Sequence, residues 1–550
     1  AVANGGTGAS TAAGARANLG ITSGTADFVA SGTLPNGAPV VLKSDGTVVT
    51  AAPTITQVAE SIPAGTEVVF NADTAYMVTA AFDPNTAGKF IAVYKDAGNS
   101  QYGTAIVGTV SGTSITFGSE YVFNTAGLEW LEVAFDPNTS GKFVLTYQDA
   151  GNSHYGTAVV GTVSGTSITF GTKSVYESSV DAEHSSIAFD PNTAGKFVVA
   201  YRGSLGKGTA IVGTVSGTSI TFGTKVEFNT GLQYSRVSFD PNTSGKFVVT
   251  YRYASNYSGR AIVGTVSGTS ITFGTAVVFN TGSTYSPAVS FDPSTAGKFI
   301  VVYRDAGNSS YGTAIVGTVS GTSITFGSEY VFTTSVSNDY TEIAFDPNTA
   351  GKFIVTYTDY VDSSYGKVIV GTVSGTSITF GSASVFNAGS STFGRPTFDP
   401  NTAGKFIIAY TDGGNSNYGT AIVGQLAATV TTPNLTSTNF LGISTASYTN
   451  AQTATVMLQG GVSTNQTGLT VGSTYYVQTD GTLATTAGTP SVEAGKALSA
   501  TSLFLSDTAD PAVALNTAKT GITSAQASAI SANTAKTGIT SSQASAITAN

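Results

Sequence analysis

A repeat of about 53 residues, present seven times, constrains the fold of this chain more than any other feature. Its clearest marker is the tripeptide Phe-Asp-Pro, which begins at Phe82, Phe135, Phe189, Phe239, Phe291, Phe345 and Phe398. Each copy is followed by a polar turn and then by Gly-Lys-Phe. Because units of this length bury their apolar faces against neighbouring units, the seven copies are expected to form one continuous repeat structure.

The pattern inside each copy predicts four β-strands. In the second copy, the strand that ends at Phe135 is followed by β-branched and aromatic runs at 143–147, 157–163 and 168–176, separated by Gly- and Ser-rich turns. Apolar residues occupy both parities of these runs, as expected for a sheet sandwiched between two others. Four strands per repeat are typical of a propeller blade. We therefore predict an all-β, seven-bladed β-propeller with four-stranded blades.

The ends of the repeat series indicate how the ring closes. The seventh copy stops near Leu426 without the Ser-Gly-Thr-Ser-Ile-Thr-Phe segment of the six earlier copies. A matching strand, 67–71, precedes the first Phe-Asp-Pro at the spacing seen before the second. We therefore expect this N-terminal strand to complete the seventh blade by overlap, which removes free sheet edges and brings residues near 66 and 427 together.

A domain whose ends meet can be inserted into another domain, and the flanking sequences favour such an insertion. The segment 39–49 reads as a hairpin with an Asp-Gly turn, and 475–483 repeats that pattern. We predict that 26–58 and 431–508 form one small β domain around a propeller at 59–430. Two separate small domains are the alternative.

The C-terminal segment, 509–550, contains a 17-residue repeat that starts at Asn516 and recurs from Asn533. Thr523 with Gln526 fits a helix capping box. Such short helices are marginal alone, so we expect them to assemble with copies of themselves as a parallel homo-oligomer.

Composition excludes several classes of protein. Charged residues make up 10% of the chain, the net charge is −9, and the 23 basic residues are scattered, which argues against nucleic-acid binding. There is no Cys, no run of 18 apolar residues and no secretion-signal pattern, so we expect neither thiolate metal sites nor membrane insertion. A start at Ala1 and an end inside a repeat predict that the sequence is part of a longer polypeptide.

The first segment, 1–25, carries a family resemblance. The stretch 4–21, which begins Asn-Gly-Gly-Thr-Gly-Ala-Ser-Thr, resembles a segment common in bacteriophage tail fibres. The repeats at 516–550 look like the low-complexity repeats of phage fibres, and the module around Gln478-Thr479-Asp480-Gly481 is similar to modules of phage structural proteins. The resemblance implies an extracellular virion appendage, a homotrimer attached to other tail proteins, that projects a domain toward the host surface.

Candidate binding residues lie where one blade crosses to the next. The turns are nearly identical between copies, whereas the crossing segments differ, and six of the seven contain an aromatic residue. The candidates are Tyr76, Glu129, Trp130, Asp181, His184, Tyr234, Tyr285, Tyr340 and Phe393. Aromatic rings beside amides and hydroxyls suit sugar binding. The alternative is that these rings fill the gaps between blades near the hub.

A second candidate set is Arg202, Arg252 and Arg304, which occupy one repeat position in three successive copies. Three guanidinium groups could hold an acidic glycan or a carboxylate, and solvated surface charge is the alternative. The Asp-Ala-Gly-Asn-Ser loops and their variant, beginning at Asp96, Asp149, Asp305 and Asp412, are expected to be Asx turns rather than calcium sites. Each Phe-Asp-Pro aspartate is expected to brace its own hairpin together with the Gly-Lys-Phe lysine.

No catalytic constellation stands out. The carboxylates near the crossing segments, Glu129, Glu132, Asp181, Glu183, Asp339 and Glu342, include no pair that the sequence singles out for glycoside hydrolysis. We therefore expect a non-enzymatic tail-fibre or appendage protein, without cofactor or metal, that attaches to bacterial surface polysaccharide or protein. The alternatives are a purely structural fibre segment and a secreted propeller glycosidase or adhesin.

Overall fold

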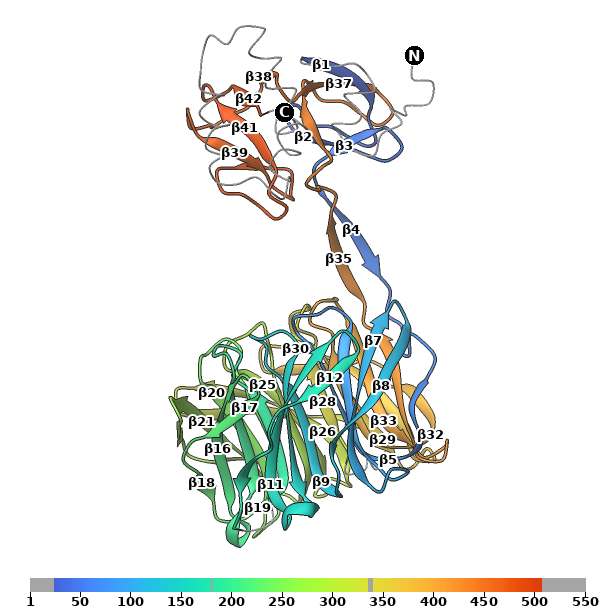
Figure 1. The fold of residues 1–550 in the computed structure, drawn as a ribbon, viewed down its shortest axis with the longest axis vertical. Coiled ribbons are helices and arrows are strands. Elements are labelled where there is room, and N and C mark those ends of the chain that lie inside the picture. Colours follow the sequence, from blue (N-terminus) through green and yellow to red (C-terminus); the bar gives the residue numbers. More distant parts are fainter. Residues whose placement is uncertain (1–23, 180–181, 335–339, 507–550) are drawn as a thin grey trace, which may run out of the picture. The chain divides into compact units, whose positions relative to one another are not determined.

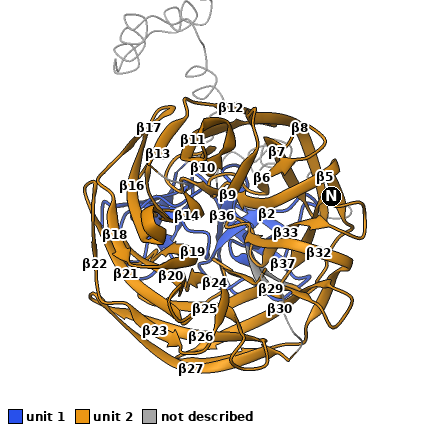
Figure 2. Cartoon of the chain, turned by 90° about the horizontal axis from the view of Figure 1, so that it is seen from below, with its two compact units in different colours: residues 1–56, 431–550 blue, residues 57–430 orange. Residues whose placement is uncertain are grey.

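The computed structural model describes residues 24–179, 182–334 and 340–506. The chain divides into two compact units, one made of Gln57–Val430 and the other of both flanks, Ala1–Thr56 with Thr431–Asn550 (Figure 2). The fibre-like stretch at 4–21 and the 17-residue repeats at 509–550 lie outside the described residues.

The regular secondary structure of the described residues is almost entirely β-strand, and the all-β propeller fold predicted from the repeats is confirmed (Figure 1). Two short 3-10 helices, η1 (Ala150–Asn152) and η2 (Ser204–Gly206), are the exceptions. Within the described part of the chain, no helix has the length and apolar character needed to cross a membrane.

In the unit 57–430, the repeats form antiparallel sheets with four strand positions, which we number from the inside of the ring outward (Figure 2). The first strands are β9 (Leu128–Phe135), β14 (Glu183–Phe189), β19 (Leu232–Phe239), β24 (Thr284–Phe291), β28 (Glu342–Phe345) and the later parts of β5 (Val68–Phe82) and β32 (Ser384–Phe398). The second strands are β6 (Lys89–Asp96), β10 (Lys142–Asp149), β15 (Lys196–Arg202), β20 (Lys246–Tyr253), β25 (Lys298–Asp305), β29 (Lys352–Asp359) and β33 (Lys405–Asp412).

The third strands are β7 (Tyr102–Ser111), β11 (Tyr155–Ser164), β16 (Gly208–Ser216), β21 (Gly259–Ser267), β26 (Tyr311–Ser320), β30 (Tyr365–Ser374) and β34 (Tyr418–Gln425). The outer strands are continuous in β8 (Ser114–Asn124) and β27 (Ser323–Thr333). Elsewhere they are interrupted: β12 (Ser167–Phe170) with β13 (Ser174–Glu177), β17 (Ser219–Phe222) with β18 (Val226–Asn229), β22 (Ser270–Phe273) with β23 (Val277–Asn280), and β31 (Ser377–Phe380) with the start of β32.

The second and third strands form the core because they are buried on both faces. In β10, seven consecutive residues after Lys142 are buried, and the apolar clusters combine residues of adjacent repeats. A glycine on the third strand permits this packing: Gly161 pairs with Phe143 across the sheet, and a Cβ at Gly161 would lie 2.0 Å from the Phe143 ring. All seven repeats keep this glycine and phenylalanine pair.

The first and last repeats are joined by strand pairing and by a shared core. The start of β5 pairs antiparallel with β34, where Val69 lies opposite Thr420. Phe82 and Phe90 of the first repeat pack in one apolar cluster with Ile407 of the last. The strand that precedes the first Phe-Asp-Pro therefore supplies the outer strand of the final sheet.

The Phe-Asp-Pro aspartate caps its own turn and also contacts the next repeat. Asp83 accepts hydrogen bonds from Asn85 N (3.0 Å) and Thr86 Oγ1 (2.7 Å) in its turn, and from Gly141 N (3.2 Å) in the second repeat. The matching contact from Gly88 N to Asp399 Oδ2 (2.9 Å) links the last repeat to the first. The aspartates thus hold neighbouring sheets together at this end of the strands.

The expectation that each lysine braces its own hairpin with this aspartate is wrong. Lys142 Nζ donates instead to Thr162 Oγ1 (2.9 Å) in its own sheet and to the Gly217 carbonyl (3.1 Å) in the next repeat. Lys405 Nζ reaches the Gly112 carbonyl of the first repeat in the same way (2.8 Å). The long lysine stem carries the ammonium past the aspartate to the neighbouring Ser-Gly-Thr-Ser turn.

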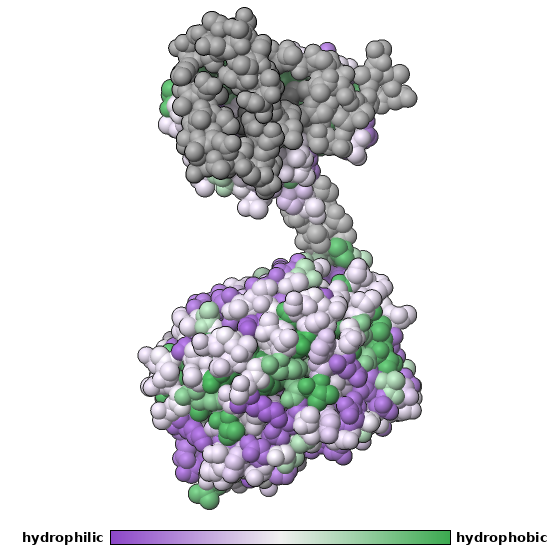
Figure 3. All heavy atoms as spheres, in the orientation of Figure 1, coloured by the Kyte–Doolittle hydropathy of each residue, from purple (hydrophilic) through white to green (hydrophobic). Residues whose placement is uncertain are grey.

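The outer surface of the propeller is polar mainly through small side chains. Apolar residues are scattered over the flank seen in Figure 3 between polar ones. Six outer strands expose a valine at one repeat position: Val69, Val122, Val175, Val278, Val331 and Val385. Isolated exposed apolar residues of this kind are ordinary on a protein surface.

The second unit contains two sheets. One has the order β1 (Thr25–Val29), β37 (Thr453–Leu458), β36 (Phe440–Ser444), β2 (Pro39–Leu42) and β3 (Val48–Thr50), so it is built from both flanks. The other has the order β38 (Val462–Ser463), β42 (Leu503–Leu505), β41 (Glu493–Ala497), β39 (Thr474–Val477) and β40 (Leu483–Ala484). Val41, Ala51 and Phe440 pack in one core with Val477 and Leu505 of the second sheet.

The two Asp-Gly hairpins of this unit have the same local structure. The Asp45 carboxylate accepts hydrogen bonds from the backbone and hydroxyl of Thr47, at 3.0 and 2.6 Å, and Asp480 does the same with Thr482. Gly46 supplies the positive φ of 82° that closes the first turn. The strands β4 (Pro53–Val58) and β35 (Ala428–Pro433) form a two-stranded ribbon at the boundary of the units.

Candidate functional site

The first strand of six repeats contains a bulge that turns one side chain toward the centre of the ring. In β9, Glu129 pairs with Gln148 and Glu132 with Thr146, so two residues of β9 lie opposite one residue of β10. The residue five positions before the Phe-Asp-Pro phenylalanine takes a positive φ in Met77 (53°), Trp130 (55°), His184 (52°), Tyr234 (50°), Ser286 (43°) and Phe393 (56°). Bulges re-aim side chains in this way beside functional sites.

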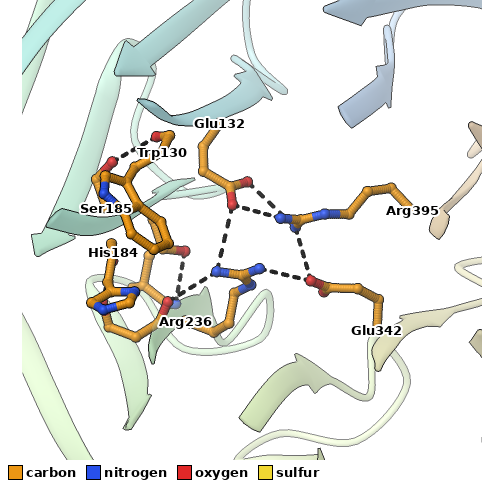
Figure 4. Close-up of polar contacts among 10 residues, drawn as sticks. Trp130, Glu132, His184, Ser185, Arg236, Glu342 and Arg395 are labelled. Atoms are coloured by element: carbon orange, nitrogen blue, oxygen red, sulfur yellow. Dashed lines mark hydrogen bonds and ion pairs between the residues drawn. The ribbon is translucent and has the colours of Figure 1, made fainter. Parts of the chain in front are cut away.

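The re-aimed side chains line one cavity of about 330 Å³, which we call the axial pocket. Its lining contains the residue at this position from all seven repeats: Met77, Trp130, His184, Tyr234, Ser286, Tyr340 and Phe393. Glu132, Arg236, Glu342 and Arg395, three positions before the phenylalanine, also line it. Figure 4 shows Trp130 and His184 beside the four charged side chains.

The aromatic wall of the axial pocket is packed ring against ring. The ring centroids of Trp130 and His184 are 4.0 Å apart, those of His184 and Tyr234 are 4.8 Å apart, and those of Tyr340 and Phe393 are 4.5 Å apart. The Ser185 hydroxyl donates to the Trp130 carbonyl at 2.9 Å. These contacts hold the rings in fixed positions, as a preformed site for a planar apolar surface requires.

Opposite in character to this aromatic wall, the charged part of the pocket is a ring of two carboxylates and two guanidinium groups. Glu342 Oε1 lies 2.7 Å from Arg236 Nη2 and 3.1 Å from Arg395 Nη1. Glu132 Oε1 lies 2.8 Å from Arg395 Nη2 and 3.5 Å from Arg236 Nη1, which completes the ring (Figure 4). The four charges cancel, so this ring offers hydrogen-bonding groups without a net charge.

Burial and the ion pairs shift the pKa values of these groups in opposite directions. Burial is the main reason that the pKa of His184 falls to about 3, and the charges of Arg202 and Arg236 act the same way. Burial alone would raise the pKa of Glu342, but Arg236 and Arg395 hold it below its usual value. His184 is therefore neutral near pH 7, and Glu342 is ionised.

Five of the residues predicted from the crossing segments meet in this pocket: Trp130, His184, Tyr234, Tyr340 and Phe393. Tyr76, Glu129 and Tyr285 do not line it, because each lies one residue before the bulge position. Tyr76 is 44% exposed, and Glu129 pairs with Lys95 at 2.8 Å. Asp181 lies outside the described residues.

The three predicted arginines have different environments. Arg202 pairs with Glu183 of its own repeat. Arg252 is buried against tyrosine rings, and Arg304 lies 5.0 Å from the Tyr285 ring and donates to Ser310 Oγ (3.2 Å). The interpretation of the set as solvated surface charge is therefore wrong for Arg252, because the crossing segment of the next repeat covers it.

The residues that sequence reasoning missed share two fixed distances from the marker. Met77 and Ser286 occupy the bulge position but are not aromatic, and Arg236 and Arg395 lie two residues later. Glu132 and Glu342 were considered among the carboxylates but not assigned to a site. Aligning the seven copies on Phe-Asp-Pro and reading the divergent columns would have found all six.

The Asp-Ala-Gly-Asn-Ser loops are Asx turns, as predicted. Asp149 Oδ1 accepts from Gly151 N (3.0 Å), and Asp96, Asp305 and Asp412 make the same contact. Asn124 Nδ2 also donates to Asp149 Oδ1 (3.1 Å). Among the described residues no group of three or more metal-ligating side chains is found.

Comparisons with known proteins return structures but no family. No protein-family model and no curated protein matches the sequence. Sqt1 from Chaetomium thermophilum, bound to the N-terminus of a ribosomal protein, is similar with a TM-score of 0.42 and 14% identity over 63% of this chain and 85% of that one. The periplasmic gluconolactonase of Pseudomonas aeruginosa has a TM-score of 0.43 and 12% identity over 56% and 85%. AofleA from Arthrobotrys oligospora has a TM-score of 0.39 and 9% identity over 65% and 95%.

Proposed function

We propose that this chain is a bacteriophage tail-fibre or appendage protein whose propeller binds a host-surface glycan in the axial pocket. The fibre assignment rests on the resemblance of 4–21 to tail-fibre segments, and the binding assignment rests on the pocket.

One observation carries the binding assignment. Phe-Asp-Pro is identical in all seven repeats, whereas the bulge position holds Met, Trp, His, Tyr, Ser, Tyr and Phe in order along the chain. A column that diverges between the repeats therefore lines one cavity with all seven of its residues. If the side chains at the bulge position served only to fill the centre of the propeller, one bulky residue type would be enough. That residue would then recur in every repeat, as Phe-Asp-Pro does.

The chemistry of the pocket suits a sugar. Its rings offer apolar faces for stacking, and the two carboxylates and two guanidinium groups offer acceptors and donors to hydroxyl groups. A volume of about 330 Å³ is near the lower end of the range of about 300–1,000 Å³ for small-molecule sites. The site therefore fits a terminal sugar rather than a long stretch of polysaccharide.

The charged ring favours binding over hydrolysis. Glycoside hydrolysis needs one carboxyl group that holds a proton at neutral pH. Glu132 and Glu342 each contact both arginines, and the pKa of Glu342 is below its usual value. A carboxylate held ionised in this way lacks the proton that a general acid must donate.

The experiment is binding of the full chain to a panel of bacterial strains, with and without their purified surface polysaccharides as competitors. The test variant is Trp130→Ala with Tyr340→Ala, which removes two rings of the pocket. The matched control is Tyr76→Ala with Tyr360→Ala, because both tyrosines are exposed and neither lines the pocket. Circular dichroism and thermal unfolding establish that each variant is folded.

We expect strain-selective binding that free polysaccharide competes away, a loss of at least tenfold in the pocket variant, and no change in the control. No binding by the parent chain, or equal binding by a folded pocket variant, would favour the purely structural fibre segment. Release of sugar from the polysaccharide would favour the glycosidase.

A further inference from the structure

Arg252 is the arginine of the propeller that has no polar partner in the described structure. Its side chain makes no hydrogen bond and no ion pair with any described residue, although only 7% of the residue is exposed. The other described arginines each have a partner, namely Glu183 for Arg202, Glu132 and Glu342 for Arg236 and Arg395, Ser258 for Arg260 and Ser310 for Arg304.

Two tyrosine rings lie against this guanidinium group. The Arg252 Cζ atom lies 4.2 Å from the ring centroid of Tyr257 and 4.1 Å from that of Tyr285. A backbone hydrogen bond joins the two segments that carry these tyrosines, because Thr284 N of the next repeat donates to the Tyr257 carbonyl at 2.9 Å. Rings stack on the face of a guanidinium group, so its edge, which carries the N–H groups, is the part that can form hydrogen bonds.

None of the described carboxylates forms a hydrogen bond or an ion pair with Arg252. Between residues 231 and 284 the only acidic residue is Asp240, and its carboxylate is bound to Asn242 N and Gly297 N at the other end of the strands. At the same repeat position, Lys95 pairs with Glu129 and Arg202 with Glu183. Arg252 thus lacks the internal anion that its counterparts have, on a chain whose net charge is −9.

This edge is close to the axial pocket. Arg252 Cζ lies 6.0 Å from the ring centroid of Tyr234, which lines the pocket. The Nε atom of Arg252 is buried without a hydrogen-bond partner, and a carboxylate that accepts this N–H together with one from a terminal nitrogen would satisfy it.

We propose that Arg252 binds the carboxylate of an acidic saccharide whose ring occupies the axial pocket. The inference rests on the proposed function and adds the ligand class: a uronic-acid or sialic-acid terminus rather than a neutral sugar.

The test measures affinity of the full chain for immobilised saccharides in matched pairs. Each pair is a uronic-acid- or sialic-acid-terminated saccharide and its carboxyl-reduced, neutral counterpart. The test variant is Arg252→Gln, a residue that the second repeat carries at this position as the buried Gln148. The matched control is Arg260→Thr, because Arg260 is on the adjacent strand β21 and most repeats have threonine there.

We expect the parent chain to bind acidic members at least tenfold more tightly than their neutral partners. Arg252→Gln reduces the affinity for acidic members to that for the neutral ones and leaves the neutral affinity unchanged, whereas Arg260→Thr keeps the discrimination. Equal affinity within the pairs, or discrimination that survives Arg252→Gln, overturns this inference while the proposed glycan site stands. Binding of no saccharide overturns both.

Discussion

At the residue scale, packing between the second and third strands depends on a glycine beside a phenylalanine ring. Gly161 faces the Phe143 ring so closely that no other side chain fits without displacing it. The seven copies of this pair explain why Val-Gly and Gly-Lys-Phe recur together in the sequence.

Gly161→Ala is therefore expected to lower the free energy of unfolding by about 1–3 kcal/mol, because the added methyl group overpacks a core site. Denaturant unfolding measures the loss. Gly165→Asn is the control, since Gly165 has a φ of 63° with nothing within 4 Å of an added Cβ, and Asn tolerates that backbone. A loss as large in the control as in Gly161→Ala would contradict the role of the phenylalanine contact.

His184 makes stability depend on pH. Because burial lowers its folded pKa from 6.5 to about 3, the unfolded chain binds a proton that the folded chain does not between these values. Stability from this group is complete above about pH 6.5 and falls as the pH drops, by at most ~1.4 kcal/mol per pH unit.

Between pH 7.5 and 5, we expect the midpoint of thermal unfolding to fall less in the His184→Phe variant than in the parent. The exposed His154 provides the control, as His154→Asn should leave the parent's pH dependence unchanged. An identical pH dependence in the parent and His184→Phe would show that this imidazole is not buried neutral.

The bulge limits what the sequence reveals at this scale. Trp130 and His184 were identified because aromatic residues stand out in variable segments. Tyr76 and Tyr285 were chosen for the same reason, although the backbone turns their following residues into the pocket instead. A positive φ at a tyrosine or tryptophan has no signature in residue type, so the sequence did not show which residue of each crossing segment points into the pocket.

At the element scale, an asparagine ladder joins the Phe-Asp-Pro turns. Asn85 Nδ2 donates to the Pro137 carbonyl of the next turn at 3.2 Å. Asn138, Asn192, Asn242, Asn348 and Asn401 repeat the contact, the last of them to Pro84 of the first repeat. The fifth turn has Ser294 instead, whose hydroxyl bonds Asp292. The turn type was predictable from its residues, but the ladder between turns was not, since it depends on the spacing of the sheets.

Ser294→Asn is expected to add the missing contact and raise the free energy of unfolding by about 0.5–1 kcal/mol, whereas Asn242→Ser should lower it by a similar amount. Differential scanning calorimetry of both variants measures the two shifts. Shifts of the same sign would argue against an additive ladder.

At the scale of the whole molecule, stability depends on the N-terminal strand that completes the sheet of the last repeat. Phe70 of β5 is buried, with its ring 5.2 Å from Tyr94, while its strand pairs with β34. Because the seventh copy is truncated, this completion of the last sheet was predictable from the sequence. The burial of Arg252 was not predictable, because it depends on which segment of the next repeat covers it.

Phe70→Ala should lower the free energy of unfolding by about 3–5 kcal/mol, as for other buried aromatic residues. The whole propeller of this variant should unfold in one transition at a lower midpoint than the parent, because β5 belongs to both the first and the last sheet. Val69→Ala is the control, since Val69 is 40% exposed beside it. Local loss of the last repeat alone, seen by hydrogen exchange, would contradict this coupling.

The resemblance to tail fibres predicts a homotrimer, so the full chain should have a mass in solution of three times 55.5 kDa. Light scattering of the full chain and of a chain ending at residue 508 tests this expectation. A monomeric full chain, or a trimer that persists without 509–550, would contradict the role assigned to the 17-residue repeats.

The two backbone hydrogen bonds between Ser61 and Gln425, at 2.8 and 2.9 Å, set how this protein can diversify. Because the first and last residues of the propeller are adjacent, its insertion requires only two neighbouring positions in the flanking unit. A domain of another kind, or a propeller with a different number of repeats, can therefore replace this one by recombination without a change in the fold of the flanking unit. One crossover near Ser61 and one near Gln425 are enough for such an exchange.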